Sequence, residues 1–210
     1  MRNKLDLSLY LVASKGRKSD AFFLNTLENA IKGGVSIVQL REKELSARKF
    51  YELGLKVQKL CKAYQIPFII NDRLDIALAL DADGVHLGQE DLEPHLARRL
   101  LGEEKIIGLS LKKLEQLAFI QGADYLGCGA IKTTPTKKSS LLSLDTLMKI
   151  SQKSPLGVVA IGGINKDVIK ELKGINLSGI AVFGAIMHAK DAFLAAKELK
   201  REINENLSLK

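Results

Sequence analysis

The sequence predicts an α/β protein that folds as one (β/α)8 TIM barrel. Eight short apolar segments alternate with segments whose apolar residues recur at helical spacing. Strand–helix alternation produces a parallel sheet with helices outside, and eight repeats favour a closed barrel over an open sheet. The length of 210 residues suits such a barrel, and no linker or low-complexity stretch divides the chain. We therefore expect residues 1–210 to form a single domain.

Each expected strand is a short run of apolar and β-branched residues, bounded by turn residues. The strands are expected at residues 7–13, 35–40, 67–71, 84–87, 105–109, 125–128, 156–161 and 179–183. The helices are expected at residues 21–32, 46–64, 74–80, 92–101, 113–121, 144–152, 166–172 and from about 189 onward. Gly33 and Gly34 end the first helix, and Ser46 is a suitable N-cap for the second.

The composition predicts a cytoplasmic protein without a membrane or nucleic-acid partner. Hydrophobic residues make up 46% of the chain, but no apolar run is long enough to span a bilayer, and the start lacks a signal-peptide core. The net charge of +8 is spread along helices of mixed sign, which is typical of solvated faces. Aromatic residues are only 5%. A disulfide between Cys61 and Cys128 is not expected in a reducing compartment.

One strand carries an unusual row of side chains. Residues two apart in a strand share a face, so Ile37, Gln39, Arg41 and Lys43 are expected to point the same way. Cations inside a core need partners. One interpretation is that the strand leaves the barrel interior at a site for a multiply charged anion. The alternative is an ordinary surface turn that closes the strand.

Two carboxylates follow neighbouring strands of the expected barrel. The active site of such a barrel lies at the carboxyl ends of its strands, where Asp72 and Asp91 are both expected. Mg²⁺ prefers a few carboxylates together with water and phosphate oxygens. One interpretation is therefore a metal-bound diphosphate beside Arg41 and Lys43. The alternative is that Asp91 caps the next helix and Asp72 pairs with Arg73.

The last strands and a polar loop suggest further anion contacts. Gly162 and Gly163 follow the seventh strand and Gly184 follows the eighth, where many barrels bind phosphate through backbone N–H groups. Ordinary turn glycines are the alternative. The loop with Thr134, Thr136 and Lys137 is either a lid over substrate or a plain connection.

The histidines do not suggest a nucleophilic enzyme. His86 is expected inside the barrel, and His95 and His188 at helices, each with a structural role. No Ser–His–Asp or Cys–His set stands out, so we do not expect nucleophilic catalysis.

Taken together, these motifs resemble the thiamine-phosphate synthase family over nearly the whole chain. The motifs are QLREK at 39–43, NDR at 71–73, GVHLGQ at 84–89 with Asp91, GLS at 108–110, TPTK at 134–137 and AIGGI at 160–164. The resemblance implies condensation of 4-amino-2-methyl-5-hydroxymethylpyrimidine diphosphate with a thiazole phosphate, or its carboxylated form. The products would be thiamine phosphate and diphosphate, with CO₂ from the carboxylated form. Diphosphate would leave first, giving a pyrimidine carbocation that the thiazole nitrogen attacks.

The resemblance also implies roles for individual residues. Asp72 and Asp91 would hold Mg²⁺, while Arg41, Lys43, Ser110 and Lys137 would act in catalysis. The substrate-binding set would be Gln39, Leu40, Arg41, Glu42, Lys43, Asn71, Ser110, Thr134, Thr136, Lys137, Gly163, Phe183 and Gly184. Within it, the cations would bind the diphosphate, Gln39 and Asn71 the pyrimidine, and the threonines and glycines the thiazole phosphate. Small-molecule substrates are thus the expected partners. Whether the chain forms a homo-oligomer stays open.

Several positions depart from the family pattern. Ala130, Lys132 and Thr133 stand where the family has proline and aromatic residues, Lys112 where it has histidine, and Gly184 where it has serine. These changes fall on the thiazole side. Two other functions stay open: a thiazole tautomerase, and a non-catalytic barrel that binds thiamine precursors or RNA. Lys112 argues against the tautomerase, which would need a histidine base there. The carboxylates beside the cations argue against the binding protein.

Overall fold

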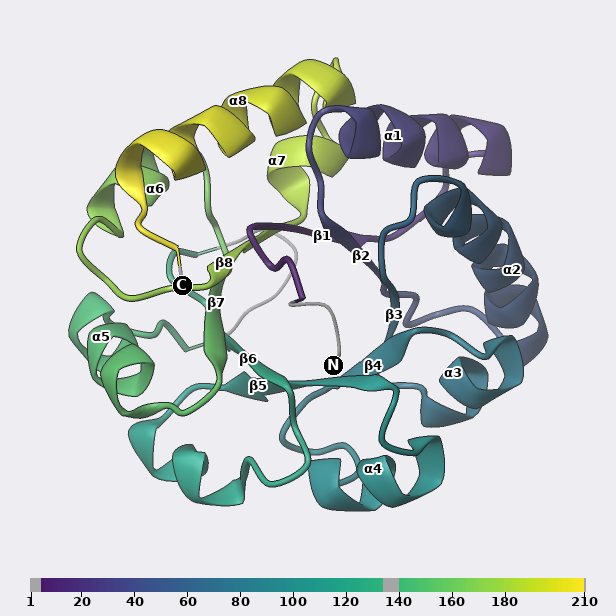
Figure 1. Cartoon of the computed structure of the whole chain (residues 1–210). Helices are drawn as coiled ribbons and strands as arrows, with labels where there is room; N and C mark the ends of the chain where they lie inside the picture. Colours follow the sequence, from purple (N-terminus) through teal and green to yellow (C-terminus); the bar gives the residue numbers. More distant parts are fainter. Residues whose placement is uncertain (1–4, 134–139, 210) are drawn as a thin grey trace.

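Eight parallel strands close into a barrel in the computed structural model of the chain, which describes residues 5–133 and 140–209. The strands are β1 (Leu9–Ala13), β2 (Ile37–Leu40), β3 (Phe68–Asn71), β4 (Gly84–Leu87), β5 (Ile106–Leu111), β6 (Tyr125–Gly129), β7 (Gly157–Ile161) and β8 (Gly179–Val182). Each strand pairs with the next, and β8 pairs with β1. The predicted barrel is confirmed (Figure 1).

Helices surround the ring of strands (Figure 1). They are α1 (Asp20–Lys32), α2 (Ala47–Ala63), α3 (Leu74–Leu80), α4 (Pro94–Leu101), the 3-10 helix η1 (Leu114–Phe119), α5 (Leu144–Lys153), α6 (Lys166–Glu171), α7 (Gly184–Met187) and α8 (Ala192–Asn206). Ser46 is the N-cap of α2, as predicted, because its hydroxyl oxygen accepts a hydrogen bond from the N–H of Lys49.

The structure departs from the prediction most clearly at three places. The helix expected at 113–121 is the short η1, none of whose residues is buried, so no apolar face holds a longer α-helix there. The last helix begins at Ala192 rather than near 189, and the unforeseen α7 precedes it. Strand β5 extends two residues beyond its expected end, so Ser110 lies within the strand and pairs with Gly127 of β6.

The apolar core has two layers, as strand alternation requires. The larger layer lies between strands and helices and includes Leu11, Leu40 and Ile70. The smaller layer fills the barrel and consists of Leu7, Tyr10, Val12, Ile37, Ile69, Tyr125, Val159 and Ala181. The side chains of the strands therefore alternate between the barrel interior and the helix layer.

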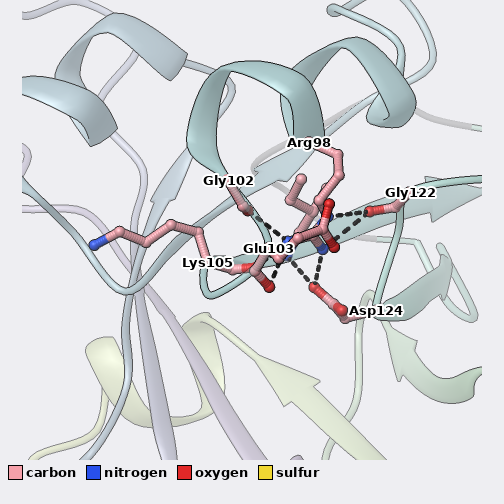
Figure 2. Close-up of polar contacts among 7 residues, drawn as sticks. Arg98, Gly102, Glu103, Lys105, Gly122 and Asp124 are labelled. Carbon is pink, nitrogen blue, oxygen red and sulfur yellow. Dashed lines mark hydrogen bonds and ion pairs between the residues drawn. The ribbon is translucent and has the colours of Figure 1, made fainter. Parts of the chain in front are cut away.

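Arg98 of α4 ties this helix to the segments that enter β5 and β6 (Figure 2). Its guanidinium donates to the carbonyl oxygens of Lys105 at 2.6 Å and Gly122 at 3.1 Å, and to Asp124 Oδ2 at 2.6 Å. Asp124 Oδ2 also accepts from the N–H of Ile107 at 2.7 Å. One largely buried side chain thus fixes α4 against two neighbouring strands.

Two further features concern the cysteines and the lengths of the helices. Cys61 and Cys128 are buried and form no disulfide, and burial raises the pKa of each thiol to about 12. In the described part of the chain, no helix has the length and apolar character needed to cross a membrane.

Candidate active site

The candidate residues at the end of β2 point in different directions. Gln39 is buried inside the barrel, with only 4% of its surface exposed, above Ile37 on the same face. Leu40 points the other way and packs in the layer between strands and helices, so its side chain does not line the barrel mouth. Arg41 continues from the strand, and its backbone N–H donates to the carbonyl oxygen of Ala13 at 2.8 Å.

Glu42 faces the loop between β1 and α1. Its carboxylate accepts the N–H of Lys15 at 2.5 Å and also bonds the hydroxyl of Ser14. Burial raises the pKa of Glu42, although these bonds and the charges of Lys15 and Arg41 act in the opposite direction. Glu42 therefore joins two loops at the barrel mouth and helps to set the backbone that carries Arg41 and Lys43.

Asp72 and Asp91 converge at the ends of β3 and β4, as predicted. Their carboxyl groups are within hydrogen-bonding reach of each other, and Lys43 Nζ lies 4.0 Å from Asp72 Oδ2. Burial, and then the charge of Asp91, raise the pKa of Asp72, while Lys43 and Asn71 act in the opposite direction. Two carboxylates held so close make a position where a cation would relieve repulsion.

The alternative roles weighed for these carboxylates do not match the structure. Asp91 does not cap α4, whose N-cap residue is Glu93, but accepts the N–H of Gly88 at 2.6 Å. Arg73 pairs with Asp75 rather than Asp72, at 2.5 Å. Within the described residues, no group of three or more His, Cys, Asp or Glu side chains is arranged to hold a metal. The assignment of Asp72 and Asp91 as metal ligands therefore stays a prediction.

A row of polar side chains crosses the barrel interior. Gln39 Nε2 donates to the hydroxyl of Tyr10 at 2.7 Å, which lies 2.7 Å from the hydroxyl of Tyr125. The Tyr125 hydroxyl is 3.0 Å from His86 Nδ1, and His86 Nε2 is 2.9 Å from the hydroxyl of Ser110. The row links the pyrimidine-side candidate Gln39 to Ser110 on the opposite wall.

Two glycines make room for this row. A Cβ atom on Gly108 would lie 2.3 Å from both His86 Nδ1 and a ring carbon of Tyr125, and one on Gly127 would lie 3.0 Å from the His86 ring. Burial lowers the pKa of His86 to about 4 and raises that of both tyrosines, so all three groups are neutral near pH 7.

Glycine turns follow both β7 and β8, and the turn after β7 approaches the segment after β6 closely. Gly162 and Gly163 both adopt left-handed backbone angles, with φ of 98° and 67°. A Cβ atom on Gly163 would lie 2.7 Å from the Cβ of Lys132, so only glycine fits this turn. Gly184 begins α7, and the ring of Phe183 packs edge-on against His188 with centroids 5.2 Å apart. These backbones lie at the position where many barrels bind phosphate.

Three predicted residues, Thr134, Thr136 and Lys137, lie outside the described residues. The other candidates lie at the carboxyl half of the barrel. Sequence reasoning did not foresee that Tyr10 and Tyr125 join His86 in one hydrogen-bonded row. Glycines within two expected strands, Gly108 and Gly127, could have indicated the row. Each leaves room for the His86 ring, and Gly108 also leaves room for the Tyr125 ring.

Together, fold and geometry define a (β/α)8 barrel whose cations, carboxylates and glycine turns gather at the carboxyl ends of its strands. The sequence profile described as thiamine monophosphate synthase matches residues 9–186. The chain belongs to this family, which confirms the predicted resemblance. Membership makes it a transferase of thiamine biosynthesis.

Individual relatives agree over the full length. The thiamine-phosphate synthase of Campylobacter jejuni subsp. jejuni serotype O:23/36 (strain 81-176) is 81% identical over 210 residues, which is 100% of both chains. That of Clostridium botulinum (strain Eklund 17B / Type B) is 45% identical over 208 residues, 98% of each. The structure of the thiamine phosphate pyrophosphorylase from Pyrococcus furiosus has a TM-score of 0.88 at 36% identity, covering 97% of this chain and 98% of that one.

Proposed function

We propose that this chain joins the aminopyrimidine diphosphate to the thiazole phosphate, or to its carboxylated form, and releases thiamine phosphate and diphosphate. CO₂ is a further product from the carboxylated substrate. The observation that carries the proposal is the cluster of Lys43, Asp72 and Asp91 at the mouth of the barrel. Full-length identity of 81% to a thiamine-phosphate synthase supports it.

The reaction we propose is dissociative. The bond between the pyrimidine methylene carbon and the diphosphate oxygen breaks, and its electron pair leaves with the diphosphate. The thiazole nitrogen then donates its lone pair to the carbocation. Such a step needs stabilisation of the leaving group rather than a nucleophilic side chain. Arg41 and Lys43 extend from the end of β2 and supply fixed positive charge for that purpose.

The carboxylate pair fits a magnesium ion. Asp72 and Asp91 offer hard oxygen ligands whose mutual repulsion a cation would remove, and a diphosphate and water would complete the coordination. Bound there, Mg²⁺ would neutralise charge that develops on the diphosphate. Asn71, which bonds Asp72, holds that carboxylate in place.

The thiazole side is assigned to the opposite part of the mouth. Gly163 and Gly184 offer backbone close to a phosphate, and Phe183 forms an apolar wall beside them. Ser110 lies between the two halves of the site. By the family resemblance, Thr134 and Thr136 complete the thiazole side, and Lys137 joins the cations that bind the diphosphate. We assign the chain small-molecule substrates only.

The test compares two aspartates only three residues apart. Asp72→Asn should lower the rate of thiamine phosphate formation about 100-fold or more, because leaving-group stabilisation is lost. Asp75→Asn is the matched control, because Asp75 is 62% exposed and Arg73 is the one side chain that its carboxylate contacts among the described residues. The control should keep near-normal activity. An unchanged rate in Asp72→Asn would overturn the metal role proposed for Asp72. Anion binding without any turnover in the wild type would favour the binding-protein alternative.

A further inference from the structure

The polar row inside the barrel has a direction, which follows from counting its protons. Gln39 Nε2 is a donor, so the Tyr10 oxygen accepts from it. Among the described residues, the Tyr10 hydroxyl has one other partner, the Tyr125 hydroxyl. The Tyr10 proton is therefore satisfied only if Tyr10 donates to Tyr125.

The same counting fixes the rest of the row. Because the Tyr125 oxygen accepts from Tyr10, the Tyr125 proton goes to His86 Nδ1, 3.0 Å away. A neutral imidazole whose Nδ1 accepts carries its proton on Nε2. His86 Nε2 then donates to the Ser110 oxygen at 2.9 Å. The Ser110 proton is left for a group in the active site.

Only one other arrangement satisfies every member of the row. If the Gln39 amide turned over, its oxygen would accept from Tyr10, and each later bond would reverse. His86 would then carry its proton on Nδ1, and Ser110 would give its proton to His86. The ligand-facing groups would change together: Gln39 would present an N–H donor, and Ser110 would present an acceptor.

Burial makes intermediate arrangements costly. Tyr10 and Tyr125 are 2% and 1% exposed, and His86 is 9% exposed. A reversed bond in the middle of the row would leave a buried hydroxyl proton without an acceptor, which is strongly unfavourable in such surroundings. The two ends of the row, on β2 and β5, are therefore coupled across the barrel.

We propose that Tyr10, Tyr125 and His86 are positioning residues that couple the donor and acceptor states of Gln39 and Ser110, and so select an amino-pyrimidine over an oxo-pyrimidine. The selectivity rests on the proposed function, whereas the proton arrangement does not. In the structure, the Gln39 amide gives its N–H to Tyr10, which leaves its carbonyl oxygen to accept from the amino group of a ligand. A ring carbonyl in place of that amino group requires the reversed row.

The first test reads the histidine directly. In ¹⁵N-labelled, ligand-free protein, NMR should show His86 with its proton on Nε2 and a bare Nδ1. Spectra of His95→Gln and His188→Gln variants assign the other two histidine signals. A proton on Nδ1 of His86, or a charged ring at pH 7, would overturn the proposed direction. This result does not depend on enzymatic activity, so it separates the row from the proposed function.

The second test breaks the row at its centre. Tyr125→Phe keeps the ring but removes the hydroxyl that joins Tyr10 to His86. We expect the wild-type kcat/KM to favour the amino- over the oxo-pyrimidine diphosphate by at least about 100-fold. Tyr125→Phe should shrink that ratio about tenfold or more and mix the His86 tautomers.

The matched control is Tyr64→Phe, which removes a hydroxyl that bonds Glu28 on the outside of the barrel. It should change neither the substrate ratio nor the tautomer. If Tyr125→Phe lowers stability but keeps the wild-type ratio and a single tautomer, the row is only structural and the proposal is wrong. Should Tyr125→Phe fail to fold, Tyr10→Phe applies the same readouts at the neighbouring bond.

Discussion

At the scale of single residues, the chemistry depends on groups held where water cannot reach them freely. Asp72 and Asp91 share a crowded space, and His86 lies between two hydroxyls in the barrel interior. Each arrangement is costly when the group takes the wrong protonation state. Charge and proton position at these residues are therefore linked to stability as well as to function.

His86 should make the protein less stable in mild acid. Its pKa is about 4 in the folded chain against an ordinary value of 6.5, so between these values the unfolded chain binds a proton that the folded chain does not. The free energy of unfolding should consequently fall as the pH decreases from 6.5 to 4, by up to about 3 kcal/mol from this residue. Urea unfolding of the wild type and His86→Asn across this range measures the difference.

The control for this titration is His95→Gln, which alters an exposed histidine on α4. It should keep the wild-type dependence on pH. Identical pH profiles for the wild type and His86→Asn would contradict the assignment of a neutral buried imidazole.

Gly163 should be required because it lacks a Cβ, and not only because glycine tolerates a positive φ. Gly163→Ala places a Cβ against Lys132, while Gly174→Ala meets nothing within 4 Å at a comparable positive φ of 85°. Both variants should lose about 1 kcal/mol of stability from the left-handed backbone, and Gly163→Ala should lose more because its Cβ must displace Lys132. Only Gly163→Ala should raise the KM for the thiazole phosphate, by about tenfold or more. Equal KM values in steady-state kinetics of the two variants would count against a phosphate contact at this turn.

At the scale of elements, the site depends on how loops and helices are anchored to the strands. Glu42 joins the loops after β1 and β2 at the mouth, and Arg98 anchors α4 where β5 and β6 begin. Both side chains bond backbone groups that lie just outside the strands. These contacts lie next to β1, β2, β5 and β6, which carry four of the five residues of the polar row.

Arg98→Lys should destabilise the barrel by roughly 2–3 kcal/mol, because lysine cannot span the carbonyls of Lys105 and Gly122 and still reach Asp124. The neighbouring variant Arg99→Lys changes an exposed position and should stay within about 0.5 kcal/mol of the wild type. Thermal and urea unfolding measure both. A loss in Arg98→Lys no larger than in Arg99→Lys would mean that the network in Figure 2 adds little to stability.

At the scale of the whole molecule, the barrel could be predicted because its periodicity is strong along the entire chain. Strands buried on both faces read as apolar runs, and the helices between them are amphipathic. The prediction missed α7, since four residues are too few to carry a helical pattern. It overextended η1, since an exposed segment has no packed face to lengthen it.

The site could be predicted where it consists of residues that follow strands in sequence. Asp72 and Asp91 converge because adjacent parallel strands end at one rim. The polar row could not be predicted in the same way, because Tyr10 and Tyr125 look like ordinary core residues until the barrel closes. Leu40 shows the opposite effect: it lies within a binding motif, yet alternation turns it into the helix layer.

The most direct measurement of the proposed function follows both products of one reaction. The wild-type chain is supplied with the aminopyrimidine diphosphate, the thiazole phosphate and Mg²⁺, and diphosphate and thiamine phosphate are quantified together. We expect the two to appear in equal amounts and formation of both to stop when a chelator is added. Diphosphate without thiamine phosphate, or no product with either thiazole form, would contradict the synthase function.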